Sequence, residues 1–340
     1  EVAFVGYKTQ RIKLQSRDAL HITLLPDNEL LDEVVVVGYG TQKKVNLTGS
    51  VASLDTKQLQ SRPIQNISNG LQGMLPGVTI SSTNGAPGRD GGNIRIRGVG
   101  TLNTASPYIL IDGVESDNLN SLDPNDIESL SVLKDAASAA IYGSKAANGV
   151  ILITTKRGKT GAPKITYSGY AGIQRPTNMI ERMSSFDYAR LYNEALAAEG
   201  KAERFTQQEL QKFKDGTDPN YPNTNWYDLA YQTGMQHTHN VTMSGGTESV
   251  KYMGSIGYMG QKGILPNAGR DKFNGRTNLD LTFSPKLTAR LGLSYINDRY
   301  TDASSAYAGG SSDQIIRQLN IVAPWIPNKL ADGTYGTVSD

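Results

Sequence analysis

The chain has 340 residues, and its 34 basic and 32 acidic side chains leave a formal net charge of +2. This balance gives no electrostatic argument for nucleic-acid binding, and the lack of cysteine in the sequence excludes disulfides, thiol catalysis and cysteine-ligated metal. A mean hydropathy of −0.40 and uniformly short apolar runs exclude a transmembrane helix, but not a membrane barrel, whose alternating strands escape such averages.

The first 26 residues contain two or three short candidate strands. Two of them, Arg11–Gln15 and His21–Leu25, alternate apolar and polar side chains as half-buried strands do. A unit of this size is too small to hold a hydrophobic core of its own. We therefore expect these strands to be the end of a larger β domain.

Four consecutive valines, Val34–Val37, follow Glu33 and favour an extended backbone, because β-branched side chains disfavour helix. The run does not alternate in polarity, so it is either a strand covered on both faces or an unpaired strand available to a partner. A strand of the second kind can add to the sheet edge of another protein through its backbone hydrogen bonds. Gly38 and Gly40 permit a flexible exit from the run.

Residues 45–158 combine short strands and short helices with loops rich in glycine, proline and asparagine. Strands are predicted at Val45–Leu54, Val78–Ile80, Ile94–Gly98, Tyr108–Val114, Ile127–Leu133 and Val150–Thr155. Short helices are predicted at Asn66–Leu75 and Ala136–Tyr142, and Asp123 and Asp135 stand where N-caps are expected. The pattern indicates a small mixed α/β unit.

From Lys164 the pattern changes to long alternating strands. Their apolar faces lie within residues 165–173, 241–243, 250–258, 273–283 and 287–295. Each run has roughly the ten residues that a tilted strand needs to cross a bilayer, whereas soluble sandwiches use ~5 to 6. Short turns at 245–248 and 284–286 alternate with long connections at 176–234, 262–272 and after 298, as in outer-membrane barrels.

The segment Leu122–Gly158, LDPNDIESLSVLKDAASAAIYGSKAANGVILITTKRG, resembles the plug-domain signature of SusC/RagA-type TonB-dependent outer-membrane transporters. The segments LQGMLPGV, IRIRGVGT and YILIDGV are similar to plug wording in the same family. DEVVVVGYGTQKK resembles the TonB-box region that precedes the plug. The resemblance thus covers the plug nearly from end to end.

The resemblance implies an N-terminal portion of such a transporter: an α+β plug domain followed by the first strands of a large antiparallel transmembrane β-barrel. It assigns residues 1–30 to the C-terminal end of an Ig-like, carboxypeptidase-regulatory-type extension and 31–44 to the TonB-box segment. Residues 45–158 would form the plug, and 164–340 the first part of the barrel with long external loops. The implied location is the outer membrane of a Gram-negative cell, as a multi-pass β-barrel.

The function implied by the resemblance is plug-gated, TonB-dependent active import of a bulky nutrient, an oligosaccharide or an oligopeptide. The implied partners are the TonB C-terminal domain, a SusD-like surface lipoprotein and outer-membrane lipid. No enzymatic activity, cofactor or nucleic acid is expected. The alternatives are a passive structural or adhesive surface barrel, a signal-transducing outer-membrane receptor, and a soluble β-rich lectin-like protein.

Three groups of residues are site candidates under this resemblance. TonB is expected to pair with Glu33, Val34, Val35, Val36 and Val37. Arg95 and Arg97 share one face of a predicted strand, which is either solvated or forms ion pairs between plug and barrel wall. The plug loops that would face substrate, or would simply connect elements, contain Asn84, Arg89, Asp90, Asn103 and Thr104.

Several fragments that suggest other chemistry are incomplete. His237 and His239 share a strand face, but no third metal ligand is evident. Gly158-Lys159-Thr160 echoes the end of a P-loop, yet Ile153 occupies the position of the required upstream glycine. No Ser/His/Asp arrangement can be assembled, so we expect neither a metal site nor catalysis.

Overall fold

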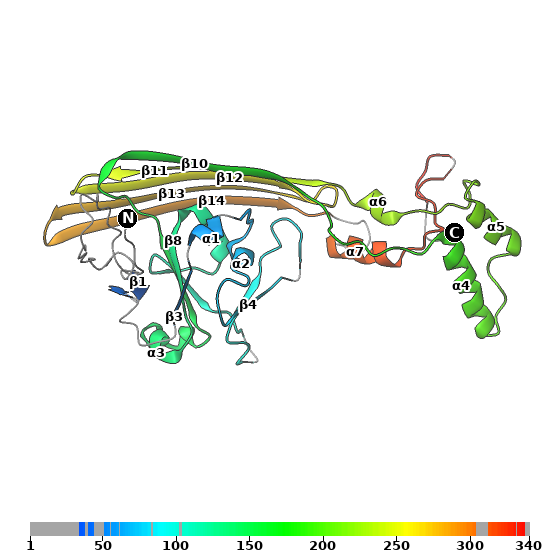
Figure 1. The fold of residues 1–340 in the computed structure, drawn as a ribbon, viewed down its shortest axis with the longest axis horizontal. Helices are drawn as coiled ribbons and strands as arrows, with labels where there is room; N and C mark the ends of the chain where they lie inside the picture. Colours follow the sequence, from blue (N-terminus) through cyan, green and yellow to red (C-terminus); the bar gives the residue numbers. More distant parts are fainter. Residues whose placement is uncertain are drawn as a thin grey trace, which may run out of the picture.

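The computed structural model describes residues 34–37, 40–43, 51–54, 56–60, 62–82, 84–101, 104–303, 312–330 and 332–336. A small α/β domain, residues 51–158, lies beneath one face of a long five-stranded sheet, and a helical region extends beyond one end of that sheet (Figure 1). The predicted Ig-like extension in residues 1–30 lies outside the described residues.

The small domain is built on a sheet with the strand order β3-β8-β9-β6-β7. These strands are β3 (Val51–Leu54), β8 (Ile127–Leu133), β9 (Val150–Thr155), β6 (Tyr108–Ile111) and β7 (Val114–Glu115). β9 pairs antiparallel with β8 and parallel with β6. Because Val150–Ile153 of β9 are buried on both faces, their side chains are apolar without alternation, as expected for an internal strand.

Two hairpins and several short helices complete this part of the chain. The hairpins are β1 (Val34–Val37) with β2 (Gly40–Lys43), and β4 (Val78–Ser81) with β5 (Asn93–Ile96). The helices are α1 (Thr56–Gln60), α2 (Ile67–Gly70), α3 (Ala136–Ala139) and the 3-10 turns Leu119–Ser121, Pro124–Asp126 and Ala140–Ala146. Asp123 and Asp135 cap helical turns as predicted.

Both helices predicted in this domain are shorter than expected. α2 ends at Gly70 rather than Leu75, because the chain turns at Gly73 and Gly77, which have φ near +75°. α3 ends at Ala139 rather than Tyr142, and a 3-10 segment follows in which Gly143 has a non-helical backbone. The turn chemistry of the glycines therefore overrides the helical spacing of the apolar residues.

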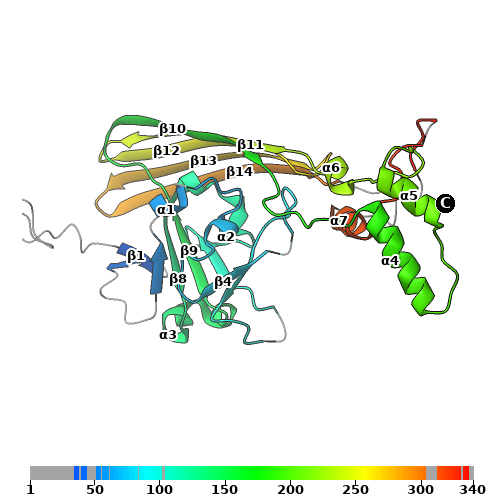
Figure 2. The ribbon, with the colours of Figure 1, turned by 45° about the vertical axis from the view of Figure 1, so that its right-hand side comes forward.

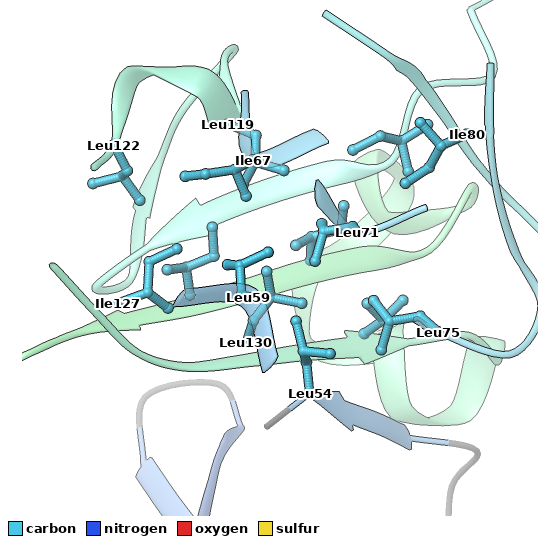
Figure 3. Packing of buried hydrophobic residues seen from close by; sticks show 14 of the residues in the cluster. Leu54, Leu59, Ile67, Leu71, Leu75, Ile80, Leu119, Leu122, Ile127 and Leu130 are labelled. Atoms are coloured by element: carbon cyan, nitrogen blue, oxygen red, sulfur yellow. The ribbon is translucent and has the colours of Figure 1, made fainter. Parts of the chain in front are cut away.

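The core of the small domain gathers side chains from its sheet and from both early helices (Figure 3). Leu59 of α1 and Ile127 and Leu130 of β8 are fully buried, with 0% of their surface exposed. Burying a leucine or isoleucine side chain contributes about 1.5 to 3 kcal/mol. α1 is thus held to the domain mainly through Leu59.

The long sheet contains five antiparallel strands in chain order. They are β10 (Gly161–Gln174), β11 (Gly234–Gly246), β12 (Val250–Lys262), β13 (Gly269–Ser284) and β14 (Leu287–Thr301). The outer face carries exposed apolar side chains such as Ile165, Val241 and Leu293, on the face that the alternation predicts. The strands are longer than predicted, and β12 and β13 continue until Lys262 pairs with Gly269, which shortens the expected 262–272 connection to residues 263–268.

The two ends of this sheet differ. At one end, tight turns join β11 to β12 and β13 to β14. At the other end lie α4 (Ser185–Ala198), α5 (Gln207–Asp215), α6 (Trp226–Ala230) and α7 (Ser312–Ile321) (Figures 1 and 2). A capping box of Thr206 and Glu209 starts α5. None of the helices among the described residues is long and apolar enough to cross a bilayer.

Candidate functional site at the interface of the small domain and the sheet

One strand of the long sheet, β13, provides the main set of contacts to the small domain. Because side chains alternate between the faces of a strand, every second residue of β13 points inward. The inward residues that bond to the small domain, named the β13 contacts, are Arg270, Lys272, Arg276, Asn278 and Asp280. Asn274 lies in the same row, but its buried Nδ2 has no hydrogen-bond partner among the described residues.

Arg270 joins three groups in a buried network. Its guanidinium holds Asp298 of β14 through two hydrogen bonds of 2.8 and 2.6 Å and donates a third, of 3.0 Å, to Asn66 Oδ1. Asn66 Nδ2 in turn donates to Asp90 Oδ1 at 2.6 Å. Burial raises the pKa of Asp90, while hydrogen bonds and the charge of Arg270 oppose that shift. The network ties the start of α2 to the sheet.

Lys272 and Asn278 bond to the backbone of the small domain. Lys272 Nζ donates to Asn120 O at 2.6 Å and to Leu122 O at 3.1 Å. Asn278 Nδ2 donates to Lys156 O at 2.7 Å and to Thr155 Oγ1 at 2.9 Å. A buried cation without an acidic partner must be satisfied by hydrogen bonds, and these carbonyls supply them.

Two ion pairs cross the interface near the end of β9. Arg276 Nη1 lies 3.5 Å from Asp112 Oδ2, and the Asp112 carboxylate also accepts from the backbone N and hydroxyl of Thr155. Arg157 pairs with Asp280. These pairs secure the chain just before it enters β10.

A buried carboxylate faces the same region of the sheet. Asp126 is 1% exposed, and its Oδ1 has no hydrogen-bond partner among the described residues. Burial, and then the charge of Asp123, raise its pKa to about 6, while a hydrogen bond from Ser255 and then the charges of Arg276 and Lys156 act in the opposite direction. This carboxylate can therefore change its protonation near neutral pH without leaving the interface.

The valines predicted to bind TonB form β1, which pairs with β2 in an isolated two-stranded hairpin. Both views place β1 beside the small domain, toward the end of the sheet with the tight turns (Figures 1 and 2). Glu33 lies outside the described residues. An extended backbone at Val34–Val37 agrees with the β-branched composition, while TonB binding stays a prediction.

Arg95 and Arg97 have no ion pair among the residues that the structure describes. Arg95 donates to Ile94 O at 2.9 Å and to Ser106 Oγ at 3.4 Å, both within the small domain. Arg97 is exposed and has a φ of 57°. Ile94 and Ile96 are buried, so the predicted alternation is present. The predicted role of the two arginines in plug–barrel ion pairs stays a prediction that needs acidic partners beyond β10–β14.

The loop candidates divide between the long-loop end and the interior. Arg89 pairs with Asp302 just beyond β14 at 2.9 Å, and Asn84 Nδ2 donates to Asp313 of α7 at 3.4 Å. Asp90, by contrast, is 7% exposed and bonds inward to Asn66, which gives it a contact within the domain rather than an open surface. Thr104 is exposed, and Asn103 lies outside the described residues.

Comparison with known proteins identifies the small domain. Residues 43–150 match the TonB-dependent Receptor Plug Domain family. The chain is 35% identical over 322 residues to the TonB-dependent receptor SusC of Bacteroides thetaiotaomicron, covering 91% of this chain and 30% of SusC. It is 37% identical over 308 residues to the TonB-dependent receptor P26 of Formosa agariphila, covering 87% of this chain and 30% of P26.

A solved structure extends the match to the arrangement of the elements. The RagAB peptide importer in its open-open state superposes with a TM-score of 0.69 and 28% identity, covering 82% of this chain and 34% of that chain. The resemblance to SusC/RagA-type TonB-dependent transporters is confirmed. These relatives are named as receptors and an importer, not as enzymes. The chain spans about 30% of the length of SusC and P26, and its small domain is called the plug below.

The β13 contacts were not among the site residues predicted from the sequence. Their signal was present, because Asn274, Arg276, Asn278 and Asp280 form a polar face opposite apolar residues of the same strand. That alternation identifies the inward face but does not identify what lies beneath it. Only the three-dimensional arrangement pairs these residues with the plug.

Proposed function

We propose that this chain acts within a TonB-dependent importer of the outer membrane, in which the plug closes the pore until TonB pulls on the valine hairpin. The observation that carries this proposal is that two parts of the plug lie toward opposite ends of the sheet. The plug loop of Asn84 and Arg89 meets the long-loop end of the sheet, whereas β1 lies toward the tight-turn end. Solute capture and energy input would therefore occur at opposite ends of the plug.

The proposed cargo is a bulky nutrient, an oligopeptide or an oligosaccharide, delivered with the help of a SusD-like surface lipoprotein. Because the similar RagAB is named as a peptide importer, an oligopeptide is the first candidate for the cargo. The aromatic segment at 221–231 gives little support to a sugar site, because Trp226 Nε1 donates to Ala323 O and the Tyr227 hydroxyl donates to Asn320. These groups are used in packing the loop.

Pairing with TonB would proceed through the backbone of β1. The hairpin with β2 contains four residue pairs, and β1 and β2 form a separate two-stranded sheet. A two-stranded hairpin is marginally stable by itself. A partner strand can therefore replace β2 or add to the other edge of β1, with affinity supplied by main-chain hydrogen bonds.

The test uses the full-length transporter in cells, with a dye-labelled oligopeptide mixture as the probe. Deleting residues 33–37 should abolish uptake and leave surface binding intact. Val35→Pro should act like the deletion because proline lacks the backbone N–H, whereas Val35→Ile should retain most of the uptake. A photocrosslinker at Val35 should capture the TonB C-terminal domain.

Other outcomes favour the alternative functions. Full uptake after the deletion contradicts the proposal and favours a passive barrel. Loss of a transcriptional response with unchanged uptake favours a signal-transducing receptor. Uptake of labelled oligosaccharides but not of oligopeptides keeps the transport mechanism and changes the cargo.

A further inference from the structure

The plug is bound unevenly along the sheet. β13 holds five parts of it: Asn66, Asp112, residues 120–122, Thr155–Lys156 and Arg157. β10 and β11 reach it through a hydrogen bond between Gln65 and Gln236 and a long one, 3.5 Å, from the Tyr170 hydroxyl to Ile64 O. Within the described ranges, no ion pair joins β10 or β11 to the plug.

A cavity of about 420 Å³ extends from this weakly bound side to Lys272 and Asn274 of β13. Its wall includes Ser168 and Gly172 of β10 and Thr238 of β11, and its plug side includes Ile64 and Gln65 as well as residues 123–125. A Cβ placed on Gly172 would meet only the Gln236 side chain, at 3.9 Å, so the wall is recessed there.

The cavity also contains an unused polar group. Asn274, at the β13 side of the cavity, is 6% exposed, and its Nδ2 has no hydrogen-bond partner in the described part of the chain. A buried amide normally finds a partner in protein or water. This amide is therefore available to water or to a polar solute that enters the cavity.

In chain order, the plug elements on the weakly bound side follow the valine hairpin directly, so a pull on the hairpin reaches them first. β3, α1 and residues 62–65 lie between the valine hairpin and Asn66, where the β13 contacts begin. β3 is joined to β8 by a ladder of four residue pairs, and α1 contributes Leu59 to the core. Tension applied at Val34–Val37 therefore reaches these elements before it reaches any group bound to β13.

We infer that the solute path opens along β10 and β11, when β3, α1 and residues 62–65 are drawn away from the cavity, while β13 keeps the remainder of the plug in place. Withdrawal of Ile64 and Gln65 removes one part of the plug side of the cavity and opens it toward Asn274, while residues 123–125, next to the Lys272 contact at Leu122, stay in place. Polar side chains such as Ser168, Gln236 and Thr238 line the path together with Tyr170 and Met259, and they can form hydrogen bonds with a hydrated oligomer. This inference rests on the proposed function, since it needs TonB to pull on β1.

The test compares two single cysteines in the full-length transporter, and the 340 residues of this chain contribute no cysteine of their own. Asn274→Cys reports on the cavity, and Ser255→Cys reports on the region bound by β13, beside Asp126. The two sites are matched in burial, because Asn274 is 6% exposed and Ser255 is 3% exposed. The probe is a membrane-impermeant sulfonated maleimide dye added to whole cells with and without TonB.

We expect TonB-dependent labelling of Asn274→Cys and none of Ser255→Cys. Equal labelling of both sites would mean that the whole plug leaves, and labelling of Ser255→Cys alone would place the path elsewhere; either result overturns the inference. No TonB-dependent labelling of Asn274→Cys overturns it as well.

A second measurement guards against an effect of the cysteines themselves. Gly172→Trp fills the cavity and should suppress labelling of Asn274→Cys, whereas Ile165→Trp, on the exposed outer face of the same strand and outside the cavity lining, should not. Unchanged labelling with Gly172→Trp contradicts the inference. If the residue 33–37 deletion abolishes uptake but Asn274→Cys stays unlabelled, only the location of the path is wrong, and the proposed function stands.

Discussion

Lys272 shows how a single residue can make the interface sensitive to the folding of the plug. The residue is 5% exposed, and its ammonium group is satisfied by Asn120 O and Leu122 O, which lie within and at the end of a 3-10 turn. Carbonyl groups are in position to accept only while that backbone keeps its conformation. The contact therefore depends on local plug structure, whereas a side-chain ion pair could survive local rearrangement.

Asp126 leads to a prediction about pH. Its pKa in the assembled interface is raised from 3.8 to about 6, mainly by burial. A carboxyl with a raised pKa binds more protons in the folded state, so its effect favours the seated plug at low pH and is lost as pH rises from about 4 through about 6. The difference between these pKa values corresponds to about 3 kcal/mol.

The measurement is thermal unfolding of the full-length protein in detergent between pH 4 and pH 8, with and without Asp126→Asn. Ionisation of Asp126 should lower the plug stability of the native protein between about pH 4 and about pH 6 and add no further loss up to pH 8. Asp126→Asn should remove the part of the slope near pH 6 and raise stability at pH 7 by up to about 3 kcal/mol, because the amide carries no charge to desolvate. An unchanged slope would show that Asp126 does not titrate in the interface.

At the scale of elements, β13 acts as the strand that retains the plug. Asn278 is 1% exposed and donates to Lys156 O and Thr155 Oγ1. Asn278→Ala should destabilise the seated plug by about 1 to 3 kcal/mol, because both acceptors remain buried without a donor. The readout is entry of a large hydrophilic antibiotic that the outer membrane normally excludes.

Asn240 of β11 provides the control for this change. It is 2% exposed, and its Nδ2 has no partner in the part of the chain that is described. Asn240→Ala removes the same side chain from another inward position without breaking a bond to the plug. Equal antibiotic sensitivity of the two variants would contradict a specific role for β13.

The elements that could be predicted from sequence are those set by local periodicity. Three kinds of feature were visible in the sequence and are present: the outward apolar and inward polar faces of the long strands, the strands at 127–133 and 150–155, and the N-caps at Asp123 and Asp135. Alternation with period two and capping chemistry act over a few residues, so they need no knowledge of the fold.

Partner identity across the interface could not be predicted in the same way. Asp90 looked like a loop residue facing solute, yet it bonds to Asn66, 24 positions earlier in the chain. Arg276 pairs with Asp112, which is 164 positions away. Nothing in the spacing of these residues encodes such distances, because the relative placement of plug and sheet is decided by packing of the whole chain.

At the scale of the whole molecule, the long-loop end is a separable structure. The segment between β10 and β11 shares a core with the region after α7, in which Phe205 and Phe213 pack with Trp325. It is tied to the region after α7 by bonds such as Trp226 Nε1 to Ala323 O, rather than to the plug. Its base is closed, because Gln174 and Gly234 face each other at the end of the β10–β11 ladder.

Because the base is closed, the long-loop end can be removed to test whether solute capture and TonB pairing occur at opposite ends of the plug, as the proposed function requires. Replacing residues 176–232 of the full-length transporter by a short Asn-Gly turn should preserve the sheet, since two paired strand ends can be joined by a tight hairpin. We expect surface binding of the oligopeptide probe to fall to background, because the loop helices are gone. Crosslinking of Val35 to TonB and exclusion of the antibiotic should persist, because neither β1 nor the β13 contacts involve the removed residues. As a control, a matched replacement of the tight turn at residues 247–249 should leave all three measurements unchanged. Loss of TonB crosslinking after replacement of residues 176–232 would show that the two ends are not independent.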